Sequence, residues 1–562
     1  MTWQGFAQFF VILALALLLA PLTGLYLKKV YNRKKTRLDF LFSPLENLIY
    51  RICRIDARVE QHWSAYAISL LAFSLAGITV SVILLMLQRF LPLNPDKIPG
   101  VIFPAALNAG ISAVTNSGWS NDIPEETLSH FSRMAVITTQ CFLSAAVAMA
   151  VAAAFTRGLT RREMRTIGNF WVDVTRSVLW ILLPLCLIAA IILIATGVPQ
   201  NFSATVDATM LQGGTQKIAE GPVASQVAAK LVTSAGAGFF SASSAHPYEN
   251  PGAFSNIFEI LLMLVIPAGF ISFFGRQASD SGKTLALFTA MGILFAVLFF
   301  ASYFGESRHN PLIDASADQT SNRNIGGNMA GKEVRFGIVG SVLWAVAANA
   351  TANASVNSSY ESMTPVSGLA LLADIMLNET VFGGAGSGLY KILVFVMLTV
   401  FIANLLTGKI PEYLGKKIEP REAGWLTLAL LIYPALLLGG AGMAVLFPDS
   451  AQTENSAAYG LTRIIYDYGS LAENNGGRFA GVNAASGAIA GILMLASRYP
   501  LIICILGLAG AFAAKKSAIP SGKSFSTNSA TFAIMLLLML IICTMLAFMP
   551  TLVLEYFSLA GT

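Results

Sequence analysis

Residues 221–251 read GPVASQVAAKLVTSAGAGFFSASSAHPYENP, and they lie between two apolar segments long enough to cross a membrane. The first third of this stretch is rich in alanine and predicts about three turns of helix, with Pro222 at its first positions. A run of small residues then ends the helix: Ser234, Ala235, Gly236, Ala237 and Gly238. A short helix followed by unwound backbone is how a pore loop presents carbonyl oxygens to a dehydrated cation. The stretch therefore predicts one wall of an ion-selectivity filter.

The composition is that of a chain with many membrane spans. Hydrophobic residues make up 55% of the 562 residues and charged residues only 12%, against about 25% charged in soluble proteins. No disulfide or zinc-binding spacing connects the five cysteines, Cys53, Cys141, Cys186, Cys504 and Cys543. The sequence thus predicts an all-α polytopic membrane protein with free thiols.

Ten segments are long and apolar enough to be transmembrane helices. They are 6–27, 64–88, 131–155, 171–196, 254–275, 284–304, 388–407, 425–447, 485–513 and 528–556. Every second loop is basic, and these loops are 28–62, 156–170, 276–283, 408–424 and 514–527. The positive-inside rule places the basic loops in the cytoplasm, so both termini are expected to face outward. The first segment lacks the features of a cleaved signal peptide and is expected to remain as a span.

The outward loops repeat one pattern. Four of them, at 103–122, 221–251, 336–357 and 459–481, hold a short apolar stretch and then a small or polar cluster. The order is span, pore helix, span, four times over, which predicts a pore with fourfold pseudo-symmetry. The expected division has the first span and basic loop at 1–62, pore repeats at 63–155, 156–275, 276–424 and 425–513, and a basic loop and last span at 514–562.

The four clusters supply the candidate ion-site residues, which are small or polar because a bulky side chain would block the pore axis. They are Thr115, Asn116, Ser117 and Gly118; Ser234, Ala235 and Gly236; Ala352, Asn353 and Ala354; and Asn474, Asn475 and Gly476. The C-terminal dipole ends of the pore helices would favour a cation. Glu473 and Arg478 flank the fourth cluster, where an exposed ion pair at the pore mouth is favoured over a direct role in selectivity.

The third repeat contains a glycine-rich stretch, FGGAGSG at 382–388. An interrupted helix at this point would leave non-helical backbone at membrane depth, which is tolerated only against protein or a water-filled cavity. We therefore consider Gly383, Gly384, Gly386 and Gly388 as a candidate gate. The alternative is a plain helical hairpin.

No motif for nucleotide or metal chemistry stands out. SGKT at 281–284 lacks the first glycine of a P-loop and connects two spans, and the four histidines are scattered. Energy for transport is therefore expected from a gradient or from another chain. The net charge of +6 is explained by the basic loops rather than by an anionic partner such as nucleic acid. Lys416 and Lys417 fit this explanation, with contact to a partner or to lipid headgroups as the alternative.

Several long and unusual motifs carry a resemblance over essentially the whole chain. They are FLPLNPDKIPG at 90–100, GPVASQ at 221–226, GFFSASSAHPYENP at 238–251, GKEVRFG at 331–337, VFGGAGSGLY at 381–390 and KIPEYLGKKIEPRE at 409–422. With these motifs the chain resembles the potassium-binding, channel-like subunit of the Kdp-type potassium-transporting P-type ATPases, within the superfamily of potassium transporters.

The resemblance implies that K⁺ is the bound and transported ion and that this chain is not itself catalytic. It implies a separate ATP-hydrolysing P-type ATPase subunit, a small single-span subunit and often a tiny membrane peptide, in a bacterial inner membrane. It also implies that Asn116, Asn353, Asn474 and Asn475 support the filter. The clusters depart from the family pattern, for example at Ser120 and at Ala354, where glutamine and glycine are usual.

Two alternatives remain open from the sequence. One is a stand-alone potassium or sodium channel of the same superfamily. The other is a non-transporting relative with a decayed filter that acts as a structural or sensing partner.

Overall fold

The computed structural model describes residues 2–119, 123–210, 213–308, 310, 326–446, 457–479, 487–516 and 527–560. Within these ranges, ten helices are long and apolar enough to cross a membrane. Eight are single helices, and the first six of these are α1 (Trp3–Tyr31), α3 (Trp63–Met86), α11 (Ala253–Gln277), α12 (Ser281–Glu306), α15 (Ser387–Leu406) and α16 (Pro420–Leu446). The last two in the chain are α18 (Gly487–Ala514) and α19 (Ala530–Ala560). All ten match the predicted spans, so the all-α polytopic fold is confirmed.

Two of the spans contain a π-helical turn. The third span runs through α6 (His130–Ser132), η2 (Arg133–Thr138) and α7 (Thr139–Thr160). The fourth runs through α8 (Phe170–Arg176), η3 (Ser177–Leu182) and α9 (Leu183–Ala195), and Pro184 lies directly after its π turn. Because proline has no N–H to donate, it removes one hydrogen bond from the regular helical ladder, and the wider turn absorbs that loss.

Four shorter helices lie between pairs of spans: α4 (Phe103–Val114), α10 (Val223–Val232), α13 (Gly337–Ala350) and α17 (Ala457–Glu473). They have 12, 10, 14 and 17 residues, so each is shorter than the roughly 20 residues that a bilayer crossing takes. Pro222 caps α10, close to its predicted place at the start of the helix. The order along the chain is therefore span, short helix, span, four times.

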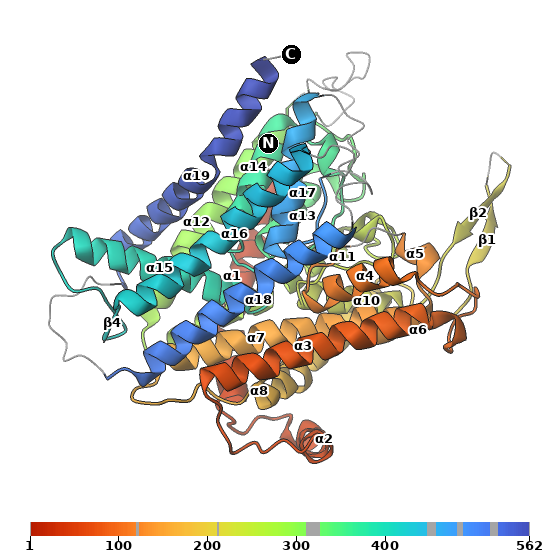
Figure 1. Cartoon of the computed structure of the whole chain (residues 1–562). Coiled ribbons are helices and arrows are strands. Elements are labelled where there is room, and N and C mark those ends of the chain that lie inside the picture. The colour runs from red at the N-terminus through yellow and green to blue at the C-terminus, as the bar shows by residue number, and fades with distance from the viewer. Residues whose placement is uncertain are drawn as a thin grey trace.

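The basic loops meet at one end of the bundle. The N–H of Gln61 bonds to the carbonyl of Gly168 (2.6 Å), and the N–H of Glu163 bonds to that of Lys515 (3.2 Å). The hairpin of β3 (Glu412–Tyr413) and β4 (Lys416–Lys417) lies at this end, while that of β1 (Val206–Thr209) and β2 (Thr215–Ile218) projects at the opposite end (Figure 1). Both ends of the chain also lie away from the basic loops (Figure 1).

The remaining elements connect these helices. Two short helices lie outside the spans: α2 (Asp39–Ile52) in the first basic loop and α5 (Pro124–Thr127) after α4. Three 3-10 turns are η1 (Gln88–Phe90), η4 (Ser243–Ala245) and η5 (Tyr360–Ser362). The helix α14 (Pro365–Met376) precedes α15, and the backbone between them is not helical. The third repeat is thus interrupted where the glycine-rich stretch predicts it.

Candidate functional site

The four short helices end in the same backbone turn. Residues with a left-handed backbone follow them at Asn116 (φ 63°), Ser234 (φ 57°), Ala352 (φ 49°) and Asn474 (φ 63°). The N–H of each bonds to the carbonyl three residues back, and the N–H of the next residue bonds to the carbonyl five residues back. This pair of bonds is a Schellman motif, which ends a helix and turns the chain away from it. The four predicted clusters therefore begin with equivalent geometry.

We name the four clusters by their order: the first segment is 115–118, the second 234–236, the third 352–354 and the fourth 474–476. Two residues after each left-handed residue stand Gly118, Gly236, Ala354 and Gly476. The three glycines have positive φ values of 62°, 70° and 87°, whereas Ala354 does not have a positive φ. Ala352, in contrast, has a left-handed backbone. This conformation is unfavourable for alanine, because the Cβ crowds the backbone.

The segments converge until their backbones touch. A Cβ on Gly118 would lie 2.2 Å from the carbonyl oxygen of Ala235, and one on Gly236 would lie 2.1 Å from the nitrogen of Ala354. A Cβ on Gly476 would lie 1.5 Å from the carbonyl oxygen of Ser117. The structure thus brings together residues that are hundreds of positions apart in the sequence, and it leaves no room for a side chain at the three glycines.

Side-chain hydrogen bonds join each segment to its neighbours around a closed ring. In three of them an asparagine amide donates to a main-chain carbonyl of an adjacent short helix or its cap: Asn116 to Thr233 (3.1 Å), Asn353 to Lys230 (3.1 Å) and Asn475 to Asn349 (3.5 Å). The fourth runs from the hydroxyl of Ser117 to the side-chain oxygen of Asn474 (3.1 Å). Each asparagine predicted to support the filter takes part in this ring.

Threonines precede three of the left-handed residues. The hydroxyls of Thr115, Thr233 and Thr351 each donate to the carbonyl four residues back, at 2.8, 2.7 and 2.8 Å. Thr233 and Thr351 were not among the predicted site residues. The sequence could have indicated them, because each directly precedes its cluster as Thr115 precedes Asn116. Glu473 has the equivalent position in the fourth segment.

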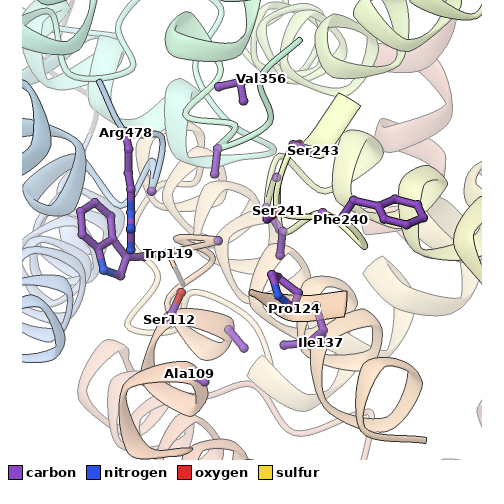
Figure 2. Close-up of a pocket in the computed structure, with 18 of the residues that line it drawn as sticks. Ala109, Ser112, Trp119, Pro124, Ile137, Phe240, Ser241, Ser243, Val356 and Arg478 are labelled. Carbon is purple, nitrogen blue, oxygen red and sulfur yellow. The ribbon is translucent and has the colours of Figure 1, made fainter. Parts of the chain in front are cut away.

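The predicted exposed ion pair between Glu473 and Arg478 is wrong. Glu473 is only 1% exposed, and its carboxylate accepts the backbone N–H of Glu379 (2.8 Å). The guanidinium of Arg478 instead lies over the ring of Trp119, with its carbon 4.2 Å from the ring centre (Figure 2). The sequence could not show this, because Glu473 closes the buried last turn of α17 rather than facing solvent.

A cavity of about 320 Å³ adjoins the convergence point, and all four segments line it. Figure 2 labels other residues of its lining: Ala109 and Ser112 on α4, Phe240, and Val356 and Arg478, which follow the third and fourth segments. Arg478 is the one charged residue among the described residues that line it. Ser120, which the sequence comparison singled out, lies outside the described residues.

The glycine-rich stretch lies directly beside the third segment. A Cβ on Gly384 would lie 3.2 Å from the carbonyl oxygen of Thr351, and one on Gly388 would lie 2.5 Å from the Cα of Gly383. Gly386 has a φ of 94°, and a Cβ there would lie 2.7 Å from the Cα of Met149 on α7. Gly383, Gly384 and Gly386 thus form buried, closely packed, non-helical backbone between α14 and α15, and Gly388 is the buried second residue of α15.

One carboxylate holds this stretch in place. Glu379 accepts hydrogen bonds from the N–H of Gly384 (3.0 Å), from the hydroxyl of Ser387 and from the ammonium of Lys391 (2.6 Å). A cavity of about 20 Å³ separates this group from the fourth segment, and Glu473, Asn474 and Arg498 also line it. Glu379, Lys391, Glu473 and Arg498 thus give this small cavity a charged lining, in contrast to the larger cavity.

Comparison with known proteins identifies the family. The model described as KdpA, potassium-transporting ATPase A subunit, matches residues 10–557. The chain belongs to this family. It is 42% identical to the potassium-transporting ATPase potassium-binding subunit of Rhodospirillum centenum, over 100% of this chain and 99% of that protein. It is also 42% identical to the protein of the same name from Pseudomonas aeruginosa, over 96% of each chain.

The KdpA fold is also similar to a solved structure. The crystal structure of the potassium transporter TrkH from Vibrio parahaemolyticus matches with a TM-score of 0.52, at 14% identity, over 91% of this chain and 98% of that one. At this identity the match shows a shared fold alone.

The structure corrects one alternative for the basic loops. Lys416 is only 1% exposed, and its ammonium donates to the carbonyls of Gly158 (3.1 Å), Arg161 and Phe512 (2.8 Å). These carbonyls lie at the ends of α7 and α18, where a cation satisfies acceptors that a helix leaves unpaired. Lys416 is thus not available for a partner or a lipid headgroup, whereas Lys417 is exposed.

Proposed function

We propose that this chain is the ion-selecting, K⁺-translocating membrane subunit of an ATP-driven potassium uptake complex. The observation that carries the proposal is the convergence of four helix C-termini, each followed by the same left-handed turn, on one hydrogen-bonded ring. The family membership supplies the ion, since relatives of similar length carry the name potassium-binding subunit.

The mechanism follows from the chemistry of the ring. Main-chain oxygens of the four segments replace the water around K⁺, and the asparagine bridges hold them at a common radius. The negative ends of the four helix dipoles lower the energy of a cation at the same point. The hydrogen bonds between neighbouring segments oppose spreading of the ring, and the close backbone contacts at three glycines oppose its narrowing. The chain performs no chemical step in this proposal, and its role is selection and passage.

Passage beyond the ring is controlled by the glycine-rich stretch. Its place beside the third segment and its attachment to Glu379 support this role for Gly383, Gly384, Gly386 and Gly388. Non-helical backbone can change conformation at small cost in hydrogen bonds, because few of its bonds belong to a helix.

The complex would contain a P-type ATPase subunit that binds and hydrolyses ATP, a small single-span subunit and a tiny membrane peptide. The chain would lie in a bacterial inner membrane, with the basic loops in the cytoplasm and both termini outward. The four span–helix–span units would be related by fourfold pseudo-symmetry, with repeats at 63–155, 156–275, 276–424 and 425–513.

Uptake of Rb⁺ or Tl⁺ by cells that carry the whole complex tests the proposal. We expect uptake that requires ATP and is inhibited by external K⁺. Uptake without the ATPase subunit would favour the stand-alone channel, and no uptake together with no K⁺ binding to the purified chain would favour the non-transporting relative.

A further inference from the structure

The helix α2 in the first basic loop has three different faces. Leu41, Leu45, Leu48 and Ile52 are exposed to 54%, 40%, 49% and 71%, and their spacing of four, three and four residues places them in one stripe. Phe42 and Glu46 are buried on a second face against the protein. Asn47 and Arg51 are exposed on the remaining side, which they share with Phe40, exposed to 80% in the first turn. A helix on a water-exposed protein surface has one face buried against the protein and one polar face toward water. The exposed apolar stripe of α2 fits neither face and therefore requires an apolar environment of its own.

Contacts on the buried face fix the depth of α2. Glu46 accepts hydrogen bonds from Arg176 (2.9 Å) and from the indole of Trp180 (2.9 Å), and the ring of Phe42 lies 5.7 Å from that of Trp180. Trp180 is four residues beyond Arg176, the last charged residue before the apolar part of its span, which is about 6 Å along the helix axis. Its carbonyl accepts the hydroxyl of Tyr26 (2.6 Å) near the end of the apolar part of α1. The helix therefore lies beside the ends of the spans, and not beyond them.

Figure 1 shows the direction of α2. It is seen nearly end-on while the neighbouring spans run across the view, so its axis crosses theirs. A helix at this depth and in this direction lies in the plane of the membrane surface.

The surroundings of the stripe are basic. The exposed cations between residues 31 and 60 are Arg33, Lys34, Lys35, Arg37, Arg51, Arg54 and Arg58. Two of the four acidic residues of this region pair with cations of another segment: Glu46 pairs with Arg176, and Glu60 pairs with Arg161 (2.8 Å). An apolar stripe flanked by unbalanced positive charge is complementary to anionic lipid, because each cation near such a surface adds about 1 kcal/mol of attraction.

We propose that α2 is an interfacial helix whose stripe at Leu41, Leu45, Leu48 and Ile52 lies among lipid acyl chains, and whose flanking basic residues bind anionic phospholipid headgroups. It would couple the first and fourth spans to the lipid composition of one leaflet, through Glu46 and its partners Arg176 and Trp180. The proposal does not depend on which ion the chain transports.

Depth-dependent quenching tests the first half of the proposal. A fluorescent label is placed on Leu48→Cys or on Asn47→Cys, both in a Cys53→Ser background, in the whole complex reconstituted in vesicles with doxyl-labelled lipid. We expect quenching at residue 48 that is strongest for shallow acyl positions, and at least several-fold less at residue 47. Equal quenching at both positions would overturn the proposal, and so would a label at residue 48 that lipid reaches only when the other subunits are absent.

Lipid charge tests the second half. The same label at residue 48 is compared in vesicles of phosphatidylcholine alone and of phosphatidylcholine with phosphatidylglycerol. We expect stronger quenching with phosphatidylglycerol, and loss of that difference in Arg51→Gln/Arg54→Gln. Arg89→Gln, an exposed arginine near the opposite end of α3, should retain it. Quenching that is the same in both lipids in the unaltered background would overturn the assignment of anionic lipid.

Discussion

Lys230 and Glu249 form an ion pair in which both side chains are completely buried. The two residues accept hydrogen bonds from the backbone within and just after the second segment. The carbonyl of Lys230 accepts the N–H groups of Ala235 and Gly236, both at 3.1 Å, before the segment turns away. Glu249 accepts the N–H groups of Phe239 (2.7 Å) and Phe240 (2.9 Å) after it. The two residues thus anchor the backbone on both sides of the second segment, and their charged groups do not face the ion path.

Glu249→Gln tests the role of this ion pair. The glutamine oxygen can still accept from the two amides, but the charge of Lys230 is left without its partner, which costs about 3–5 kcal/mol when the site is buried. We expect a lower thermal stability of the purified complex and, in the complex that survives, an altered ratio of Rb⁺ to K⁺ uptake. Glu333→Gln is the matched control, because its pair with Arg335 is partly exposed and worth at most about 1 kcal/mol. An unchanged stability for Glu249→Gln would contradict the prediction.

Gly476→Ala should abolish uptake. The added methyl would lie 1.5 Å from the carbonyl oxygen of Ser117, and the φ of 87° is unfavourable for alanine. Gly442→Ala on α16 meets nothing within 4 Å and should leave uptake unchanged. The measurement is the initial rate of Rb⁺ uptake by each variant and by the unaltered chain at matched expression. Normal uptake by Gly476→Ala would show that the fourth segment does not border the ion path.

Ala354→Gly and Ala352→Gly should act differently although both replace an alanine of the third segment. The methyl of Ala354 projects toward Gly118 and Gly236, so its removal widens the ring, and we expect a changed KM for K⁺ and weaker discrimination against Na⁺. Ala352 has a left-handed backbone, so glycine there relieves strain and should stabilise the chain by about 1 kcal/mol. Uptake kinetics and thermal melting separate the two, and identical kinetics for Ala354→Gly and the unaltered chain would refute the first expectation.

Glu379→Gln should loosen the glycine-rich stretch. Its ion pair with Lys391 is lost, while neutral hydrogen bonds to Gly384 and Ser387 remain possible. We expect K⁺ leak through proteoliposomes that hold the complex without ATP, where the unaltered complex is tight. Glu126→Gln, on the exposed outer loop, provides the control. A tight Glu379→Gln complex with normal ATP-driven uptake would count against the gate.

Lys416 predicts a dependence of stability on pH. Burial lowers its pKa to about 8, and the nearby charges of Arg162 and Lys515 act in the same direction. In the unfolded chain the pKa is about 10.4, so between these values the unfolded state binds more protons than the folded state. The contribution of this group to the free energy of unfolding therefore rises with pH across that window.

Thermal melting of the complex below and above pH 8 measures this contribution. Lys416→Met should reduce the rise in melting temperature with pH, whereas Lys417→Met, one residue away and exposed, should not. The same pH slope in all three proteins would refute the assignment to Lys416.

Much of the fold follows from local patterns in the sequence. A run of about twenty apolar residues can satisfy its backbone in lipid only as a helix, so the ten spans could be located without a structure. The short helices and the clusters after them were also visible, because runs of small and polar residues such as those from Ser234 to Gly238 disfavour a continued helix. The amphipathic α2 was missed, since its apolar residues are hidden among the arginines and lysines of a basic loop.

The relations among distant residues were not visible. The family resemblance drew attention to Ala354, where glycine is usual, but the left-handed residue is Ala352, because the turn comes directly after Thr351, the C-cap of α13. Charge alone suggested that Glu473 would face solvent. Only the packing of α17 against the chain at Glu379 shows that it is buried.

By itself, the sequence determined that this chain crosses the membrane about ten times and that four short helices end in small and polar residues. These properties depend on hydropathy and on local backbone preferences, which act over a few neighbouring residues. The tertiary structure alone decided that the C-terminal ends of the four short helices meet. It also decided which asparagine joins which pair of neighbouring segments, and which charged residues lie behind the ring. Such contacts join residues separated by more than a hundred positions, and they depend on how the spans pack rather than on any local pattern.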